Sequence, residues 1–305
     1  MIKINFVDFW PGFRKTDNYF FHLLNTKYNV VIDEDNPDIL FFSVDYARRR
    51  ERDRYKNKKC KRVFFTGENV RPNFDSDDSI EYKNYSIGKS DIAFTFDYSD
   101  DKRNYRFPLW AFYTNWFNSV YIPERDPAYL VDTECFKQRS IIGNKNLFCN
   151  FLFSNPSGER INILNLVQKY KPVHCPGRLM NNCKPIGGRG DQIEKINFIS
   201  RFKFTIAAEN SQYDGYTTEK MIHPLSVGSI PIYWGSNRVT EEFNEMAFIN
   251  ANKLSGYDLL KTIIEIDQND NLYNDIISQP IFRNNQIPEY VLPENVLEYI
   301  ERSIL

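Results

Sequence analysis

Between positions 216 and 220 the chain places a phenol ring, a hydroxyl, a carboxylate and an ammonium group, on Tyr216, Thr218, Glu219 and Lys220. An ammonium group in the first turn of a helix joins free N–H groups and a partial positive charge, an arrangement suited to a phosphate. The carboxylate can accept hydrogen bonds from sugar hydroxyls, and the ring offers a face to a base or a sugar. A capped helix with a solvated Glu–Lys pair has the same spacing, so the spacing alone leaves both interpretations open.

Two apolar runs flank this segment and predict the elements that position it. Residues 202–208 and 230–234 have the composition of buried strands, and residues 216–227 between them have that of a helix. Strand, helix and strand in this order form a βαβ unit, which implies a parallel sheet. Ligands of such sheets bind beyond the carboxyl ends of the strands, where Glu209, Asn210 and the four residues above fall.

The composition limits the class of protein and its partners. With 305 residues, the chain is long enough for two domains with separate cores. A net charge of −1 favours neither nucleic acid nor an anionic membrane surface as a partner. The sequence shows no long apolar span and no signal peptide, so we expect a cytoplasmic protein without stable membrane insertion. The five cysteines form no regular framework and no standard metal pattern, which indicates free thiols and no metal site.

Strands and helices alternate along both halves of the chain. Strands are predicted in the first half at 2–7, 28–32, 39–44 and 62–66, with a helix at 18–26. The alternation starts again after Cys149, with a strand at 151–154 and a helix at 156–170. This pattern is typical of doubly wound α/β domains. We therefore expect an α/β protein with one domain at 1–145 and another at 146–305, whose last helix could return across the boundary.

Three blocks of sequence resemble the α-1,3-fucosyltransferases of glycosyltransferase family 10. The run AENSQYDGYTTEK (208–220), followed by SIPIYWGS (229–236), resembles the donor-binding signature of that family. FFTGENVRPNF (64–74) resembles the block that carries its catalytic base, and FLFSNPSGERINILNLVQKYKPV (151–173) resembles the opening of its donor domain. The resemblance covers roughly residues 62–266. It implies two Rossmann-like domains facing across a cleft, the GT-B arrangement.

The resemblance also implies roles for individual residues. It places the catalytic base at Glu68, in the acceptor-side domain. Glu219 would be the second catalytic carboxylate, binding hydroxyls of the ribose or fucose or stabilising positive charge on the sugar ring. Either Arg178 or Arg189 would contact the diphosphate, and Asp8 is the alternative base. The donor-binding residues implied are Ser154, Asn155, Arg178, Asn210, Tyr216, Thr218, Glu219 and Lys220.

The implied reaction is transfer of L-fucose from GDP-β-L-fucose to a hydroxyl of a carbohydrate acceptor, with inversion and an α-1,3-type linkage. The base takes the acceptor proton, and cationic side chains hold the departing diphosphate, so no metal or other cofactor is required. Stimulation by a divalent cation stays open. Two alternatives remain: a related transferase that uses another GDP-linked sugar, and a non-catalytic sugar- or nucleotide-binding protein of the same fold. Mere binding would not need a base at Glu68.

Overall fold

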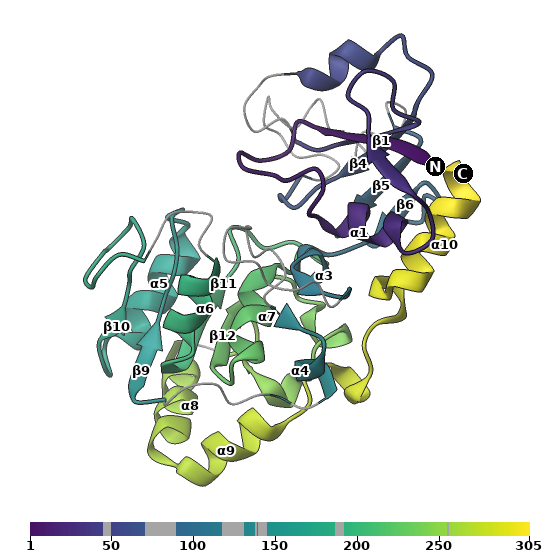
Figure 1. The fold of residues 1–305 in the computed structure, drawn as a ribbon. Helices are drawn as coiled ribbons and strands as arrows, with labels where there is room; N and C mark the ends of the chain where they lie inside the picture. The colour runs from purple at the N-terminus through teal and green to yellow at the C-terminus, as the bar shows by residue number, and fades with distance from the viewer. Residues whose placement is uncertain are drawn as a thin grey trace. The chain divides into compact units, whose positions relative to one another are not determined.

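A computed structural model describes residues 1–44, 50–70, 90–117, 131–137, 139, 145–186, 192–254 and 256–305. The chain divides into two compact units, each containing a parallel sheet flanked by helices (Figure 1). The first unit combines Met1–Phe112 with Glu289–Leu305, and the second is Tyr113–Pro288. No helix among these described residues is long and apolar enough to cross a membrane.

The sheet of the first unit has six strands in the order β2-β1-β3-β4-β5-β6, and every neighbouring pair is parallel. All residues of β3 and β5 are buried, as expected for a parallel sheet with both faces covered. The carboxyl ends of all six strands therefore meet at one edge. The strands are β1 (Ile2–Val7), β2 (Val30–Ile32), β3 (Ile39–Phe42), β4 (Lys61–Phe65), β5 (Ile92–Thr95) and β6 (Asn104–Arg106).

Helix α1 (Tyr19–Asn25) begins at Asn18, whose side chain accepts a hydrogen bond from the Phe21 N–H at 3.0 Å. Such a bond satisfies one of the free donors at a helix start. On its inner face the Phe20 ring contacts the rings of Phe41 and Phe94, with centroids 5.0 and 5.1 Å away. Three shorter helices of this unit are η1 (Glu51–Tyr55), α3 (Leu109–Phe112) and η6 (Glu289–Val291).

The last helix, α10 (Pro293–Ile304), packs on the first unit, beside α1, and is drawn in yellow in Figure 1. The Tyr299 ring lies 4.6 Å from that of Tyr105, and its hydroxyl donates to the Lys102 carbonyl at 3.0 Å. The Glu301 carboxylate forms an ion pair with Lys27 at 2.6 Å. These contacts make α10 part of the first unit, although the whole second unit separates it in sequence from these neighbours.

The sheet of the second unit has the order β10-β9-β11-β12-β13, again with parallel neighbours throughout. Its core combines Phe204, Ile206 and Ile232 from the strands with Leu164 and Ile263 from the helices. The strands are β9 (Leu147–Asn150), β10 (Val173–His174), β11 (Phe202–Ala208), β12 (Ile230–Trp234) and β13 (Ile249–Asn250).

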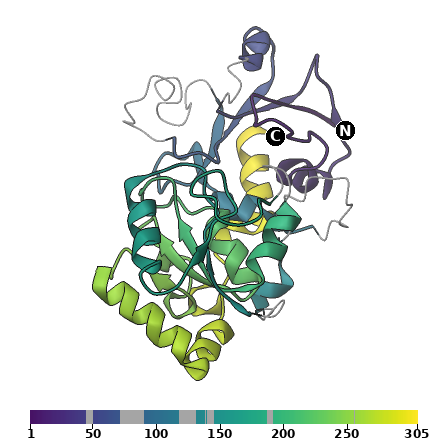
Figure 2. The same cartoon turned by 90° about the vertical axis from the view of Figure 1, so that its left-hand side faces the viewer.

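Five longer helices belong to the second unit, and two of them, α8 and α9, follow one another directly and are drawn in yellow-green in Figure 2. They are α5 (Gly158–Val167), α6 (Gln192–Ile199), α7 (Glu219–Ser226), α8 (Gly256–Gln268) and α9 (Asp270–Ser278). The smaller elements are β7 (Thr114–Asn115), β8 (Val131–Asp132), α4 (Glu134–Lys137), η3 (Val239–Glu241), η4 (Glu245–Ala247) and η5 (Arg283–Asn285).

The boundary between the units differs from the one predicted near residue 145, because it falls after Phe112. Two described residues that follow Phe112, Phe136 and Arg139, contact the second unit. The Phe136 ring lies edge-on to that of Phe282, with centroids 4.8 Å apart, and Arg139 donates to the Ile276 carbonyl at 2.9 Å. These partners lie more than a hundred positions away in sequence, so local sequence pattern gives no sign of the true boundary.

We predict that Ile300→Ala destabilises the first unit, because Ile300 on α10 is completely buried. Removing a buried Ile side chain typically costs about 2–5 kcal/mol of unfolding free energy. Glu298→Ala, at an exposed position of the same helix, serves as the control. Amide hydrogen exchange should show faster exchange in β5 and β6 for Ile300→Ala and little change for Glu298→Ala. Equal exchange in the two variants would mean that α10 does not stabilise this unit.

Candidate functional site

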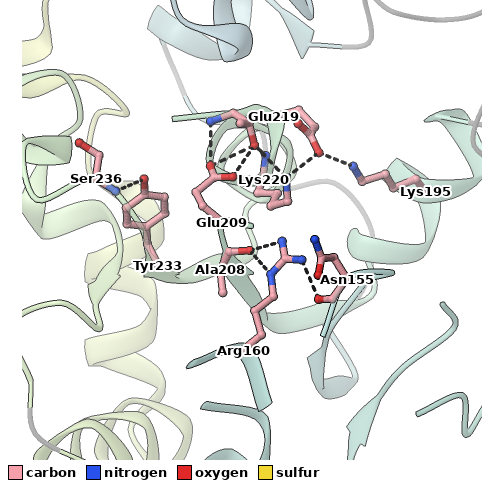
Figure 3. A network of polar contacts seen from close by, with 10 residues as sticks. Asn155, Arg160, Lys195, Ala208, Glu209, Glu219, Lys220, Tyr233 and Ser236 are labelled. Carbon is pink, nitrogen blue, oxygen red and sulfur yellow. Dashed lines mark hydrogen bonds and ion pairs between the residues drawn. The ribbon is translucent and has the colours of Figure 1, made fainter. Parts of the chain in front are cut away.

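Side chains with the predicted chemistry follow three neighbouring strands of the second unit. Because β9, β11 and β12 are parallel, their carboxyl ends lie at one edge of the sheet. Ser154 and Asn155 follow β9, Glu209 and Asn210 follow β11, and Gly235 follows β12. The chain between Glu209 and the start of α7 crosses the same edge, and the network it forms there is shown in Figure 3.

Glu209 is the centre of this network and is completely buried. Its Oε1 accepts from the Thr218 N–H at 2.8 Å, and its Oε2 accepts from the Thr218 hydroxyl at 2.9 Å. Oε2 also lies 3.3 Å from the Lys220 ammonium nitrogen. Every polar neighbour named here is a donor, which suits a carboxylate. A buried charge is costly unless it is paired and hydrogen-bonded, and here both conditions are met.

Thr218 connects this carboxylate to the start of α7. Its hydroxyl oxygen accepts from the Lys220 ammonium at 3.0 Å and from the Lys220 backbone N–H at 3.4 Å, which caps the helix. The backbone of Thr218 is extended, so α7 begins at Glu219 and not at residue 216 as predicted. The preceding turn needs Gly215, whose φ is +88°, and its N–H donates to the Ser236 hydroxyl at 2.9 Å.

A second carboxylate, Glu219, lies between two ammonium groups. Its Oε1 is 3.4 Å from Nζ of Lys220 and 3.5 Å from Nζ of Lys195 on α6. Burial by itself would raise the pKa of Glu219, but Lys220 and Lys195 outweigh it and hold that pKa well below its usual range. Burial would likewise lower the pKa of Lys220, yet Glu209 and Glu219 together raise it. Glu219 and Lys220 thus keep their charges at neutral pH, whereas burial raises the pKa of Glu209 although Lys220 opposes that effect.

Arg160 and Gly235 hold the back of the site. Arg160, 1% exposed on α5, donates from Nε and Nη2 to the Ala208 carbonyl at 3.0 and 2.7 Å. Its Nη1 donates to the Asn155 carbonyl at 3.1 Å, which ties the exit of β9 to the end of β11. A Cβ on Gly235 would lie 2.6 Å from Cγ of Glu209, so only glycine leaves room for that carboxylate.

The remaining predicted donor residues lie at the same edge with different exposure. Ser154, Asn155 and Arg178 are exposed, and Asn210 is half-buried. The loop with Arg178 lies against the exit of β9, because a Cβ on the preceding Gly177 would be 2.5 Å from the Phe153 carbonyl oxygen.

Two predicted positions give a different result. Tyr216 is 2% exposed, so its ring has no open face for a ligand in this structure. Arg189 lies outside the described residues. Across the described ranges, no three His, Cys, Asp or Glu side chains gather in a way that could hold a metal ion.

Sequence reasoning placed Glu209 at the ligand-binding edge but gave it no role, and it did not select Lys195. The signal for Glu209 is its position directly after a buried strand, which is the ligand-binding edge of a parallel sheet. Lys195 carries no such signal. It is one charge on a helix, and only the packing of α6 beside α7 brings it to Glu219.

In the first unit, Glu68 follows β4 at the carboxyl edge of the sheet. The Thr66 hydroxyl donates to the Glu68 carbonyl at 2.9 Å and accepts from the Glu68 N–H at 3.1 Å, so a tight turn fixes this residue. Gly67 is needed inside the turn, because a Cβ there would lie 2.7 Å from Cδ1 of Leu109. The side chain of Glu68 is half-buried.

An aromatic pocket of about 230 Å³ lies at the same edge, after β1. Its lining includes Phe9, Trp10, Phe13 and Lys15. The Phe9 ring stacks on that of Phe65, the last residue of β4, with centroids 6.1 Å apart. A pocket with rings and polar groups of this kind can accept a sugar ring.

Asp8, the alternative base, is 5% exposed and caps η1. Its two oxygens accept from the Glu51 and Arg52 N–H groups at 2.9 and 3.1 Å. Both oxygens of this carboxylate are therefore engaged by the backbone at the start of η1.

Two family models match the chain in succession. The α-(1,3)-fucosyltransferase FucT N-terminal domain matches residues 4–113, and the C-terminal part of glycosyltransferase family 10 (fucosyltransferase) matches residues 143–278. The chain belongs to glycosyltransferase family 10. The second match contains the Glu209–Lys220 network, and the first contains Glu68, so the candidate residues of both units lie within the family regions.

Two similar proteins are named as fucosyltransferases. The α-(1,3)-fucosyltransferase FucT of Helicobacter pylori is 28% identical over 84% of this chain and 55% of its own length. A putative fucosyltransferase of Acanthamoeba polyphaga mimivirus, R654, is 36% identical over 58% of this chain and 31% of its own. The chain thus spans about half of the length of the first of these relatives and less than a third of the second.

Solved structures show the fold. A crystal structure of an α1,3-fucosyltransferase superposes with a TM-score of 0.72 at 22% identity, covering 99% of this chain and 90% of that chain. A structure of an α1,3-fucosyltransferase with GDP-fucose matches with a TM-score of 0.66 at 22% identity, covering the same shares of both chains. The predicted fold class, an α/β protein of the GT-B type, is confirmed.

We predict that Glu209→Gln and Lys220→Met each destabilise the protein, because each leaves a buried charge without its partner. Breaking a buried pair costs about 3–5 kcal/mol of unfolding free energy, and the 19% exposure of Lys220 places the loss toward the lower end. The double variant should lose less than the sum of the single losses. Urea unfolding measures all three.

The matched control for these single and double variants is the exposed ion pair of Lys253 and Glu245, 2.6 Å apart. Lys253→Met should cost less than about 1 kcal/mol, because water already screens this pair. Additive losses for Glu209→Gln and Lys220→Met would show that the two buried groups do not stabilise each other.

Proposed function

We propose that this chain is a fucosyltransferase that transfers L-fucose from GDP-β-L-fucose to a hydroxyl of a glycan acceptor, with inversion and an α-1,3-type linkage. The observation that carries the proposal is the network at the start of α7. It presents a helix N-terminus, an ionised carboxylate and ammonium groups at the ligand-binding edge of a parallel sheet. Membership of glycosyltransferase family 10 and the fold shared with a GDP-fucose-bound protein support it.

The second unit would bind the donor. Lys195 and Lys220 provide positive charge for the diphosphate, and Arg178 adds an exposed guanidinium beside the exit of β9. Glu219, held ionised by its two lysines, would accept hydrogen bonds from sugar hydroxyls or stabilise positive charge on the fucose ring. Asn210, Ser154 and Asn155 are accessible at the same edge. Because cationic side chains supply the charge, the donor would need no metal.

The first unit would supply the acceptor half of the reaction. An inverting displacement needs a base to take the proton of the attacking hydroxyl, and Glu68 would have this role. The turn that fixes its backbone at the carboxyl edge of the sheet supports the proposal. The aromatic pocket after β1 lies at the same edge of the sheet and would accept a sugar ring of the glycan. The departing GDP is already a stable anion, so no general acid is required on the donor side.

We predict that the 305-residue chain binds GDP and GDP-fucose with at least about tenfold higher affinity than UDP, since the guanine base must be recognised as well as the diphosphate. Calorimetry in the presence of a chelator measures the three affinities and tests for a metal requirement. Turnover is followed by release of free GDP from GDP-fucose, GDP-mannose and UDP-galactose with mixed glycan acceptors. Equal affinity for GDP and UDP would contradict the proposal. Turnover of GDP-mannose but not of GDP-fucose would show that the transferred sugar is mannose and not fucose.

We predict that Glu68→Gln lowers kcat by about 10²–10⁴-fold, because the amide keeps the size of the side chain but accepts no proton. The Kd for GDP-fucose and the melting temperature should change little. The acidic limb of the pH–rate profile should disappear, since that limb reports protonation of the base.

Asp97→Asn is the matched control, because Asp97 is a half-buried carboxylate just after the neighbouring strand β5. It should keep most of its activity. Near-normal turnover by Glu68→Gln, or an equal loss in both variants, would remove Glu68 as the base.

A further inference from the structure

The segment between β3 and β4 of the first unit concentrates positive charge. Residues 50–62, called here the basic segment, contain eight basic and two acidic side chains and carry a net charge of +6. The whole chain has a net charge of −1, so its other residues are acidic on balance. The basic side chains are those of Arg50, Arg52, Arg54, Lys56, Lys58, Lys59, Lys61 and Arg62.

The basic segment runs from one edge of the first sheet to the other. The backbone N–H groups of Glu51 and Arg52 donate to Asp8, which follows β1 at the carboxyl edge. The segment ends at the amino edge, where the Lys61 N–H donates to the Asp38 carbonyl at 2.8 Å, directly before β3. Because β4 spans five residues, the two edges lie about 15–20 Å apart.

Tyr55 anchors the middle of the basic segment to the sheet. It is buried, and its hydroxyl oxygen accepts from the side-chain amide of Asn5 on β1 at 2.8 Å. Nη2 of Arg62 donates to the carbonyls of Tyr55 and Lys56 at 2.8 and 3.2 Å, which fixes the chain on both sides of this anchor. With Tyr55 turned inward, the lysines that follow it face solvent. The exposed lysines are Lys56, Lys58, Lys59 and Lys61.

The charges of these lysines are not neutralised by the protein. Within the described part of the chain, the ammonium groups of Lys56, Lys59 and Lys61 form no hydrogen bond or ion pair. The ammonium group of Lys58 donates to the backbone carbonyl of Asp35, which carries no charge. Each of these groups can therefore contact an anionic ligand. One exposed contact is weak, so binding needs a ligand that reaches several of them.

A pocket of about 520 Å³, called here the amino-edge pocket, lies where the basic segment ends. Its lining comes from the start of β1 and from the residues just before β3 and β4. The ammonium group of Lys3 in this lining is paired with Asp33 at 2.9 Å. Lys58 and Lys59 then stand against one lining carboxylate, that of Asp38, so the pocket keeps a positive charge. Its volume is large enough for a small ligand such as a sugar group.

The other end of the basic segment reaches the aromatic pocket at the carboxyl edge. Glu51, the first residue of η1, belongs to the lining of that pocket. The basic segment therefore connects a pocket lined by rings with a pocket lined by lysines, both on the first unit. A ligand that occupies both pockets has to be a chain of several sugar units and not a single sugar.

The basic segment lacks features that favour other polyanions. Single-stranded nucleic acids stack their bases on exposed rings, but Tyr55 is the only aromatic residue between 50 and 62 and it is buried. Membrane-binding surfaces add exposed apolar side chains to their basic ones, and no exposed large apolar side chain lies between 50 and 62. Exposed ammonium groups between two pockets favour a glycan that carries phosphate, sulfate or carboxylate groups.

We propose that the acceptor is an anionic glycan. One of its sugar rings lies in the aromatic pocket, and its phosphate, sulfate or carboxylate groups contact Lys56, Lys59 and Lys61 between that pocket and the amino-edge pocket. The inference rests on the proposed function, because it names the class of glycan that the first unit takes as acceptor.

The test is a triple variant of the 305-residue chain, Lys56→Gln, Lys59→Gln and Lys61→Gln. Fluorescence anisotropy measures its affinity for labelled oligosaccharides of equal length: a sulfated heparin fragment, an oligogalacturonate, a phosphorylated mannan fragment and a neutral dextran fragment. The unmodified chain should bind at least one anionic probe more tightly than dextran, and the tightest arm identifies the anionic group. The triple variant should bind that probe on the order of tenfold more weakly, because three exposed charge contacts are lost.

The loss should depend on salt and on charge. Raising the ionic strength from about 0.01 to 1 M shortens the screening length from about 30 to 3 Å and should reduce the difference between the two proteins. The matching triple Lys→Arg variant keeps the charges and should keep most of the affinity. In turnover assays with mixed glycans, the Gln variant should raise the KM of anionic acceptors and leave kcat nearly unchanged.

The matched control is a second triple variant, Lys102→Gln, Lys169→Gln and Lys261→Gln. These three lysines are exposed and lie outside the basic segment, so the net charge of the chain changes equally. The control should bind the anionic oligosaccharides as tightly as the unmodified chain. Equal losses of affinity in the two triple variants would show a general electrostatic effect and overturn the inference.

The remaining outcomes separate the inference from the proposed function. If the unmodified chain releases no GDP from GDP-fucose with any acceptor, the proposed function fails. If it turns over GDP-fucose and the Lys→Gln variant of the basic segment keeps its affinity for every anionic oligosaccharide, only the inference fails. Tighter binding of duplex RNA or of phosphatidylglycerol vesicles than of any oligosaccharide would overturn the inference, as would equally tight binding of tripolyphosphate, which has no sugar.

Discussion

The buried contact between Glu209 and Lys220, joined through the Thr218 hydroxyl, is the constraint on which the site in the second unit depends. An isolated carboxylate at this depth would cost several kcal/mol, so the turn must deliver an ammonium group and a hydroxyl to it. The backbone of Thr218 is extended where its N–H and hydroxyl contact Glu209, and α7 begins at the next residue. These contacts hold the first turn of α7 against the end of β11, and they thereby set the position of Glu219.

The residues around this contact are restricted in side-chain size, backbone conformation or hydrogen bonding. Gly235 has no side chain where Glu209 approaches, and Gly215 adopts a left-handed conformation so that the turn can close on Ser236. The Arg160 guanidinium donates two hydrogen bonds to the carbonyl of Ala208, the last residue of β11. A cationic side chain near a proposed diphosphate site is therefore not necessarily a ligand-binding residue, and its hydrogen-bond partners decide between the two roles.

Much of the fold could be predicted from the sequence, because it depends on local patterns. The apolar runs that became β11 and β12 and the alternation of strands with helices indicated two parallel sheets, and the carboxyl-edge rule placed Glu219 and Glu68. What could not be predicted depends on contacts between distant residues. Phe136 and Arg139 belong to the second unit because their partners lie far along the chain, so the boundary lies earlier than predicted. Tyr216 is buried although its motif suggested an open ring face. Lys195 reaches Glu219 only because α6 packs beside α7.

The return of α10 to the first unit makes the second unit an insertion within the first. During translation, all of Tyr113–Pro288 leaves the ribosome before α10 does. The contacts of Tyr105 with Tyr299 and of Lys27 with Glu301 therefore cannot form until α10 is synthesised, when the second unit already has its complete sequence. The order of synthesis thus favours completion of the second unit first, although the first unit supplies the leading residues of the chain.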